Sequence, residues 1–308
     1  MPELPEVEAL ARFLRERTVG RTVGAVEVGA VNALKTYSPA PDALVGRVVT
    51  GVRRRGKWLD VTTTDDSPRD ADASGDPAPA HPLHLLVHLA RAGWLRWYER
   101  VPSTTIRPGR SPIALRVRLD DGSGFDLTEA GTRKRLAVHV VTDPTHVPAV
   151  ATLGVEPLAP EFTTERLAEL LAARNQQVKG LLRDQGTIAG IGNAYSDEIL
   201  HAARLSPFAP TRSFDAERTA GLHRAVVDVL GEAVATASGR PAAELKDTKR
   251  RGMRVHGRTG EPCPGWDGVP CGDTVREVAF ADSSLQYCPT CQTGGHLLAD
   301  RRMSRLLR

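Results

Sequence analysis

The chain has 308 residues and a mass of 33.2 kDa, which favours about two domains. With 41% hydrophobic and 25% charged residues, its composition is that of an average soluble globular protein, which excludes the disordered, fibrous and membrane classes. No apolar stretch reaches the ~18 residues of a spanning helix, and the opening residues carry acids where a signal peptide carries a basic region. We therefore expect a cytoplasmic protein that makes no contact with a membrane.

The net charge is small but unevenly distributed. Forty-one Lys and Arg against 37 Asp and Glu give only +4, too little to indicate a partner. Between residues 240 and 258, however, seven basic residues face two acidic ones, and four more arginines lie at the C-terminus. These basic residues are Arg240, Lys246, Lys249, Arg250, Arg251, Arg254, Arg258, Arg301, Arg302, Arg305 and Arg308. A solvated surface explains such a cluster as well as nucleic-acid binding does, so other features must decide.

The first 150 residues show the pattern of a β domain. A helix over 5–17 comes first, with Val7, Leu10 and Leu14 at helical spacing. Short β-branched or alternating runs follow at 22–28, 47–53, 58–63, 83–89, 94–99, 115–119, 125–128 and 136–141. These runs predict an eight-stranded sandwich, or otherwise a barrel, with the helix packed against it. Two tracts between them, 64–82 and 102–112, predict long mobile loops.

The middle of the chain reads as helical. Leucines and valines recur at helical spacing from about 163 to 238, and the last helix covers about 215–237. We therefore expect an α+β protein with a β domain over 1–150, a helical domain over 151–244, a third segment over 245–296 and a basic tail over 297–308.

All the cysteines lie in the third segment, at Cys263, Cys271, Cys288 and Cys291. A disulfide pair is the alternative, but a cytosolic chain of this length needs none, and the Cys288–Cys291 spacing is one that tetrahedral zinc prefers. The residues between Cys271 and Cys288 fit a two-stranded zinc ribbon with strands from 275–285. Seven residues separate Cys263 from Cys271, more than is usual, so we expect that segment to bulge outward. The pattern predicts one structural Zn²⁺ per chain.

Five motifs, in order along the chain, resemble the formamidopyrimidine-DNA glycosylase and endonuclease VIII family of base-excision repair enzymes. They are residues 2–8 (PELPEVE), 54–57 (RRGK), 184–193 (DQGTIAGIGN), 255–263 (VHGRTGEPC) and 288–292 (CPTCQ). The resemblance implies an N-terminal catalytic β-sandwich, a helix-two-turns-helix DNA-binding domain and a C-terminal zinc finger. It also implies a bacterial, nucleoid-associated monomer that acts on damaged double-stranded DNA without a nucleotide cofactor.

The first residues can carry the chemistry. Once Met1 is removed, Pro2 presents a secondary amine with a pKa near ~8, which can attack the anomeric carbon of a damaged nucleotide. Glu3, its neighbour, is placed to shuttle protons. Taken alone, Pro2 and Glu3 also fit an ordinary helix start. The resemblance assigns them as nucleophile and acid/base, with Lys57 beside them on the DNA backbone.

Further residues match the positions at which the family contacts DNA. Glycines such as Gly192, followed by Asn193 at a helix start, allow N–H groups to approach a phosphate, although a tight turn without a ligand looks the same. A lone strand histidine is more often simply packed. The resemblance assigns DNA contacts to His88, Lys179, Gly192, Asn193 and Arg258.

The departures from the family are as informative as the matches. Arg91 stands where the family usually has a gap-filling methionine, and Arg133 remains a gap-filling residue, but Arg135 and Leu136 follow where an aromatic plug is expected. Ser283 replaces a phosphate-gripping arginine of the finger. An arginine can stack and hydrogen-bond with the orphaned base, so we expect base extrusion to survive with altered opposite-base preference.

The sequence therefore predicts a bifunctional DNA glycosylase and apurinic/apyrimidinic lyase acting on oxidised bases. Oxidised purines and oxidised pyrimidines both remain open as substrates. The alternative from a different class is a damage- or structure-specific DNA-binding protein without turnover.

Overall fold

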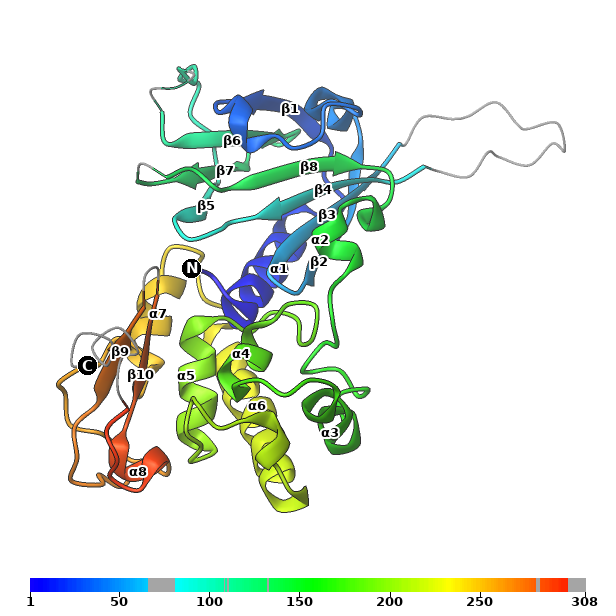
Figure 1. Cartoon of the computed structure of the whole chain (residues 1–308). Helices are drawn as coiled ribbons and strands as arrows, with labels where there is room; N and C mark the ends of the chain where they lie inside the picture. The colour runs from blue at the N-terminus through cyan, green and yellow to red at the C-terminus, as the bar shows by residue number, and fades with distance from the viewer. Residues whose placement is uncertain (66–80, 108, 110, 132, 281–282, 299–308) are drawn as a thin grey trace, which may run out of the picture. The chain divides into compact units, whose positions relative to one another are not determined.

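The computed structural model describes residues 1–65, 81–107, 109, 111–131, 133–280 and 283–298. Two compact units form: the first contains Met1–Thr152 and Ala237–Leu245, the second Leu153–Thr236 and Lys246–Arg308 (Figure 1). Most of the predicted loop 64–82 and the four arginines of the basic tail lie outside the described residues. The domain boundaries proposed from the sequence stay predictions.

The first unit contains the predicted β-sandwich. Its two four-stranded antiparallel sheets have the orders β2-β3-β4-β8 and β1-β6-β7-β5, so the α+β fold class is confirmed (Figure 1). The strands are β1 (Val23–Val28), β2 (Val48–Arg55), β3 (Trp58–Thr64), β4 (Leu83–His88), β5 (Gly93–Tyr98), β6 (Ile113–Leu119), β7 (Gly124–Glu129) and β8 (Ala137–Val141). Short helical turns η1 (Val31–Ala33), η2 (Pro41–Leu44), η3 (Pro144–His146) and α2 (Pro148–Ala151) complete the unit.

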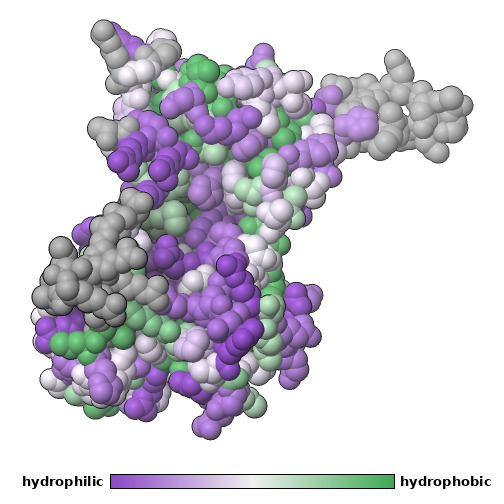
Figure 2. Space-filling view, in the orientation of Figure 1, coloured by the Kyte–Doolittle hydropathy of each residue, from purple (hydrophilic) through white to green (hydrophobic). Residues whose placement is uncertain are grey.

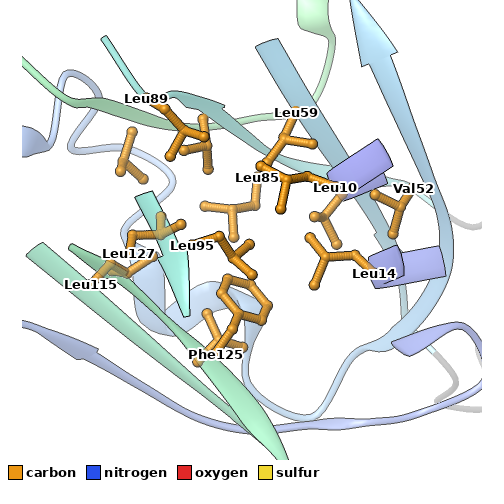
Figure 3. Packing of buried hydrophobic residues seen from close by; sticks show 14 of the residues in the cluster. Leu10, Leu14, Val52, Leu59, Leu85, Leu89, Leu95, Leu115, Phe125 and Leu127 are labelled. Atoms are coloured by element: carbon orange, nitrogen blue, oxygen red, sulfur yellow. The ribbon is translucent and has the colours of Figure 1, made fainter. Parts of the chain in front are cut away.

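Helix α1 (Leu4–Thr18) closes the core between the sheets. Leu10 and Leu14 meet Leu59 and Leu85 of one sheet, while Leu127 belongs to the other sheet (Figure 3). Each such buried leucine contributes roughly 1.5–3 kcal/mol of transfer free energy. Hydrophilic residues cover much of the visible face of each unit, interrupted by smaller hydrophobic areas (Figure 2). The alternation of apolar and polar residues along the strands thus places the apolar side chains in the core between the sheets and leaves the loops at the surface.

The second unit contains the predicted helices and the finger. The elements are α3 (Thr164–Ala173), α4 (Val178–Arg183), α5 (Asn193–Ala202), η4 (Thr211–Ser213), α6 (Ala216–Ala237), α7 (Leu245–Gly252), β9 (Arg276–Ala279), β10 (Ser284–Tyr287) and α8 (Pro289–Thr293). Strands β9 and β10 form the expected antiparallel hairpin. Helix α7 was not expected from the sequence. Within the described residues, every helix is too short or too polar to cross a membrane.

Candidate active site and nucleic-acid interface

The N-terminus is held by a capping box at the start of α1. Glu3 is the N-cap; its side chain accepts from the backbone N–H of Glu6, and its own N–H donates to Glu6 Oε2 at 2.9 Å. Both acids are 2% exposed, Pro2 is buried and Met1 is 46% exposed. Pro2 and Glu3 thus lie at the start of a helix, as the alternative interpretation of the sequence expected. The capping box fixes the backbone next to the Pro2 nitrogen.

Lys57 lies in the tight turn between β2 and β3. Arg55 pairs with Trp58, so Gly56 and Lys57 form a two-residue turn, and Gly56 adopts the left-handed φ of +54° that such a turn requires. Arg54 ties this turn to α1, because its guanidinium pairs with Glu8 at 3.1 Å and donates to the Gly56 carbonyl at 3.2 Å. Lys57 is therefore held at the end of the sandwich where α1 begins.

His88 ends β4 beside this turn. It pairs with Trp58 across the strands, and the two ring centroids lie 4.9 Å apart. Burial, together with the nearby charge of Lys57, lowers the pKa of His88 to about 4, so the imidazole is neutral at physiological pH. A packed strand histidine and a hydrogen-bonding site residue are both compatible with this environment.

Two cationic loops adjoin the same end. Gly93 pairs with Glu129, and Ala130 N–H donates to the Ala92 carbonyl at 3.4 Å, so the β4–β5 turn and the β7–β8 loop are neighbours. Ala90 holds the first turn with φ +51°, a conformation that costs a non-glycine residue about 1–2 kcal/mol. The exposed cations of these loops are Arg91, Arg133, Lys134 and Arg135.

The β7–β8 loop is anchored from inside. Glu129 Oε1 accepts from the backbone N–H of Arg135 at 2.7 Å and of Leu136 at 3.0 Å. Leu136 is only 1% exposed and packs in the sandwich core, so it does not project as a plug. Because Ala137, the first residue of β8, pairs with His88, all these loops meet at one end of the first unit. The structure brings Lys57, His88 and the loops of Arg91 and Arg133 to this end, and the Arg54–Glu8 ion pair holds α1, which Pro2 and Glu3 precede, against the same turn.

In the second unit, the glycine-rich turn before α5 is fixed by Gln185. The Gln185 side chain accepts from Gly190 N–H at 3.0 Å and donates to the Ile191 carbonyl at 2.8 Å. Gly192 is the N-cap of α5, and Asn193 is its first residue. Asn193 Nδ2 donates to the Ser284 carbonyl at 2.7 Å, while its buried Oδ1 has no hydrogen-bond partner among the described residues.

Lys179 lies beneath this turn rather than on the surface. It is 5% exposed, and its ammonium binds Asp197 Oδ1 at 2.5 Å, Ser196 Oγ at 2.7 Å and the Asn193 carbonyl at 3.2 Å. These contacts favour a role for Lys179 in positioning the turn. Its predicted contact with DNA stays a prediction.

Arg258 caps the end of α7. Its guanidinium donates to the carbonyls of Met253 at 3.3 Å and Arg250 at 3.4 Å, and pairs with Glu261 at 3.0 Å. These bonds already engage much of the donor capacity of Arg258. Its predicted contact with a phosphate stays a prediction.

Sequence reasoning missed the acids of α5. The backbone N–H groups of Arg254, Val255 and His256 donate to the Glu198 carboxylate at 2.7, 3.0 and 2.8 Å. Burial raises the pKa of Glu198, although these bonds act in the opposite direction. Its neighbour Asp197 accepts from His256 Nδ1 at 2.7 Å as well as from Lys179. Two adjacent acids inside an otherwise apolar helix were the available signal.

The four cysteine sulfurs converge within 4.8 Å of one another. The Sγ atoms of Cys263 and Cys291 are 3.9 Å apart and those of Cys271 and Cys288 are 3.5 Å apart, too far for disulfides. A tetrahedral Zn²⁺ with ~2.3 Å bonds requires about 3.8 Å between sulfurs, so the set fits such an ion. Burial raises the pKa of Cys291 to about 12, which a bound cation would reverse.

Neighbouring side chains support this cluster. Asp273 Oδ2 accepts from the backbone N–H of Thr290 at 3.1 Å and from its hydroxyl at 2.9 Å, joining the two cysteine turns. His201 Nε2, on α5, lies 3.2 Å from Cys263 Sγ. The segment between Cys263 and Cys271 forms a tight loop in which the backbone of Gly265 approaches the Val269 carbonyl. A Cβ at Gly265 would lie 1.9 Å from that oxygen, so only glycine fits there. The long spacing thus closes as an outward loop.

Comparisons with known proteins agree with this architecture. The formamidopyrimidine-DNA glycosylase N-terminal domain matches residues 1–138, and the formamidopyrimidine-DNA glycosylase H2TH domain matches residues 153–242. A formamidopyrimidine-DNA glycosylase of Chloroflexus aurantiacus is 33% identical over 302 residues, covering 95% of this chain and 98% of that protein. The chain belongs to the formamidopyrimidine-DNA glycosylase family. Membership confirms the expected enzyme class, a formamidopyrimidine-DNA glycosylase-like enzyme.

Two further relatives extend the comparison. An uncharacterized formamidopyrimidine-DNA glycosylase-like protein of Mycobacterium tuberculosis is 57% identical over 152 residues, 49% of this chain and 93% of that protein. A crystal structure of a Lactococcus lactis glycosylase mutant in complex with DNA containing Fapy-dG has a TM-score of 0.77 and 25% identity, covering 95% of this chain and 100% of that one. The family likeness thus extends through both units and the finger.

Proposed function

We propose that this glycosylase is bifunctional, excising oxidised bases from duplex DNA and then cleaving the strand as an apurinic/apyrimidinic lyase. The observation that carries the proposal is the N-terminus, where a capping box fixes Pro2 and Glu3 at the loop end that also holds Lys57. The Lactococcus lactis relative was crystallised with DNA containing Fapy-dG, which supports damaged duplex DNA as the partner.

The reaction begins at the Pro2 nitrogen. After Met1 is removed, a fraction of this secondary amine is unprotonated at neutral pH, because α-amino groups titrate near ~8. The amine attacks C1′ and displaces the base, and opening of the sugar ring leaves an iminium. The iminium acidifies C2′, and removal of a C2′ proton expels the 3′ phosphate by β-elimination. A second elimination expels the 5′ phosphate.

Glu3 supplies the protons in this proposal. Its carboxyl group protonates the ring oxygen as the sugar opens, and the resulting carboxylate can accept a proton again. The same carboxylate caps α1, so its position is set by the helix rather than by a mobile loop. Lys57 holds the phosphate beside the lesion, and Asn193 with the N–H groups at the start of α5 holds another.

Arg91 and Arg133 fill the gap left by the extruded base. Both are exposed, and the neighbouring loops that carry them are anchored through Glu129 and the strained Ala90 turn. A guanidinium stacks on the neighbouring bases and donates to the orphaned partner, whereas a methionine only fills space. Discrimination among partner bases therefore rests on these arginines.

The preferred lesion is a separate question. Rates of base excision from duplexes carrying 8-oxoguanine or thymine glycol distinguish a preference for oxidised purines from one for oxidised pyrimidines.

The four cysteines would hold one structural Zn²⁺ per chain. When bound, the ion charges the thiolates and fixes the two cysteine turns of the finger. Elemental analysis of chelator-washed protein should give about one zinc per chain; a folded protein without zinc would contradict this part of the proposal. We infer that the enzyme acts as a monomer in the bacterial cytoplasm, on nucleoid DNA, since the relatives are bacterial.

Borohydride trapping on duplex DNA with an abasic site tests the mechanism. Wild type lacking Met1 should form a covalent adduct, and both a Pro2→Gly variant and a form retaining Met1 should form far less. Absence of an adduct from correctly processed wild type would favour the alternative, a DNA-binding protein without turnover. The departures from the family at Arg91, Ser283 and the buried Leu136 would then account for the lost activity.

A further inference from the structure

The basic run between residues 240 and 258 is divided by the structure into two sets. Some of its cations bind within the chain: Arg240 lies 3.8 Å from Glu244, Arg254 lies 3.5 Å from Glu232, and Arg258 caps α7. The others belong to α7 itself. Arg240, Arg254 and Arg258 are therefore less available to a ligand than the arginines of α7.

Helix α7 has a buried face and a basic face. Leu245 and Thr248 are 1% and 8% exposed, and Lys249 lies against α5. The exposed residues are Lys246, Asp247, Arg250 and Arg251, which fall on the other side at i, i+1, i+4 and i+5. No carboxylate among the described residues pairs with Arg250 or Arg251. The outer face thus carries three cations and one acid.

The buried face of α7 packs beside α5, whose N-terminal turn carries Asn193. The Lys249 ammonium lies 4.7 Å from the centroid of the Tyr195 ring, two residues after Asn193, and α5 and α7 run side by side (Figure 1). Glu198 fixes the chain that leaves α7 by accepting three backbone N–H groups, and Arg258 caps its last carbonyls. These contacts fix the backbone from which the outer arginines of α7 project.

We propose that Arg250 and Arg251 form a further contact surface for the phosphates of DNA, on the helix that packs beside α5 and its turn at Asn193. The inference rests on the proposed function, in which that turn binds a phosphate. Phosphodiesters suit the surface because the two arginines are exposed, adjacent and without a carboxylate partner among the described residues, and one acid, Asp247, lies on the same face. The surface would strengthen binding without reading sequence.

The test compares Arg250→Gln/Arg251→Gln with a matched control, Arg212→Gln/Arg224→Gln, which removes the same charge from exposed arginines of η4 and α6. Binding to an abasic-site duplex is measured from about 50 to 200 mM salt. Loss of two phosphate contacts should reduce the slope of log K against log salt by about 1.8, so that the affinity deficit of the α7 variant shrinks by roughly tenfold over this range. The control should keep the wild-type slope.

A slope equal to that of wild type in the α7 variant, with unchanged melting temperature and zinc content, would overturn the inference. Equal losses in both variants would overturn it as well, because net charge alone would then explain them. The proposed function is tested separately by the wild type: failure of wild type to be trapped on the abasic duplex refutes the lyase mechanism, whereas the α7 inference fails only through its own slope. Trapping of the α7 variant at saturating protein checks that its catalytic end is intact.

Discussion

The two regions that we propose to contact DNA use their charged residues in different ways. At the loop end of the sandwich, Arg91 and Arg133 are exposed on loops anchored from inside by Glu129. Around α5 in the second unit, Lys179 and Asp197 are buried and bonded to each other. The loop arginines of the first region thus lie at the surface, although Lys57 there is only 8% exposed, whereas the Lys179–Asp197 pair of the second region holds the backbone that a ligand would meet.

Replacing Glu3 by Gln should have the largest effect and would sharpen the contrast at the catalytic end. Single-turnover base excision should fall by about 10²–10⁴-fold, the usual contribution of a general acid or base. Affinity for DNA should hardly change, since glutamine retains a cap acceptor for α1. Loss of binding with loss of the folded N-terminus would instead make Glu3 a structural residue.

A pair of substitutions tests the comparison itself. Lys179→Met leaves Asp197 buried without its cation and should cost about 3–5 kcal/mol of unfolding free energy. Arg133→Met should change stability by no more than about 0.5 kcal/mol and lower DNA affinity instead. Urea denaturation and DNA titration of both variants measure these effects. The reverse order of stabilities would show that the two regions do not differ in this way.

Asp60 should make the stability of the protein sensitive to acid. Burial alone would raise its pKa, but hydrogen bonds from His84 at 2.7 Å and Arg55 at 2.8 Å outweigh it and hold the pKa below 3.8. Because the folded pKa is the lower one, the contribution is present above pH ~4 and is lost as pH falls through the folded pKa. Asp60→Asn should lose about 1.5–3 kcal/mol at pH 7 and show a shallower acid decline in urea titrations.

The exposed Asp120 provides the control for that experiment. Asp120→Asn should leave the acid decline of the wild type in place. An identical decline in the Asp60 variant would mean that other carboxylates govern the acid response.

The last prediction concerns the metal site. His201→Phe removes the group 3.2 Å from Cys263 Sγ and should weaken zinc retention by about 10–100-fold, as loss of an outer-sphere partner usually does. Competition with a chromophoric chelator measures it. The control is His223→Phe, because His223 stacks on Phe162 and bonds to its carbonyl, away from the cysteines. Equal retention by both variants would remove His201 from the support of the site.

Sequence patterns predicted the strands, the helices and the clustering of the cysteines because each depends on local periodicity or spacing. The same patterns did not show that Lys57 and Lys179 are both buried, at 8% and 5% exposed, or that Lys179 bonds to Asp197, because these properties depend on tertiary packing. Helix α7 was missed because its run of cations has the composition of a loop, and its contacts are with distant segments, as between Lys249 and Tyr195. The sequence showed that the aromatic plug is missing at Arg135 and Leu136, but not that Leu136 belongs to the core.

The exposed Met1 that precedes buried Pro2 has a consequence for how the enzyme is made. On the proposed mechanism, the newly synthesised chain is a precursor whose nucleophile is still tied up as an amide. An aminopeptidase that reaches the exposed first residue converts it into the active form without any change in fold. A fusion tag at the amino terminus would therefore yield a well-folded protein that binds DNA and leaves every lesion in place.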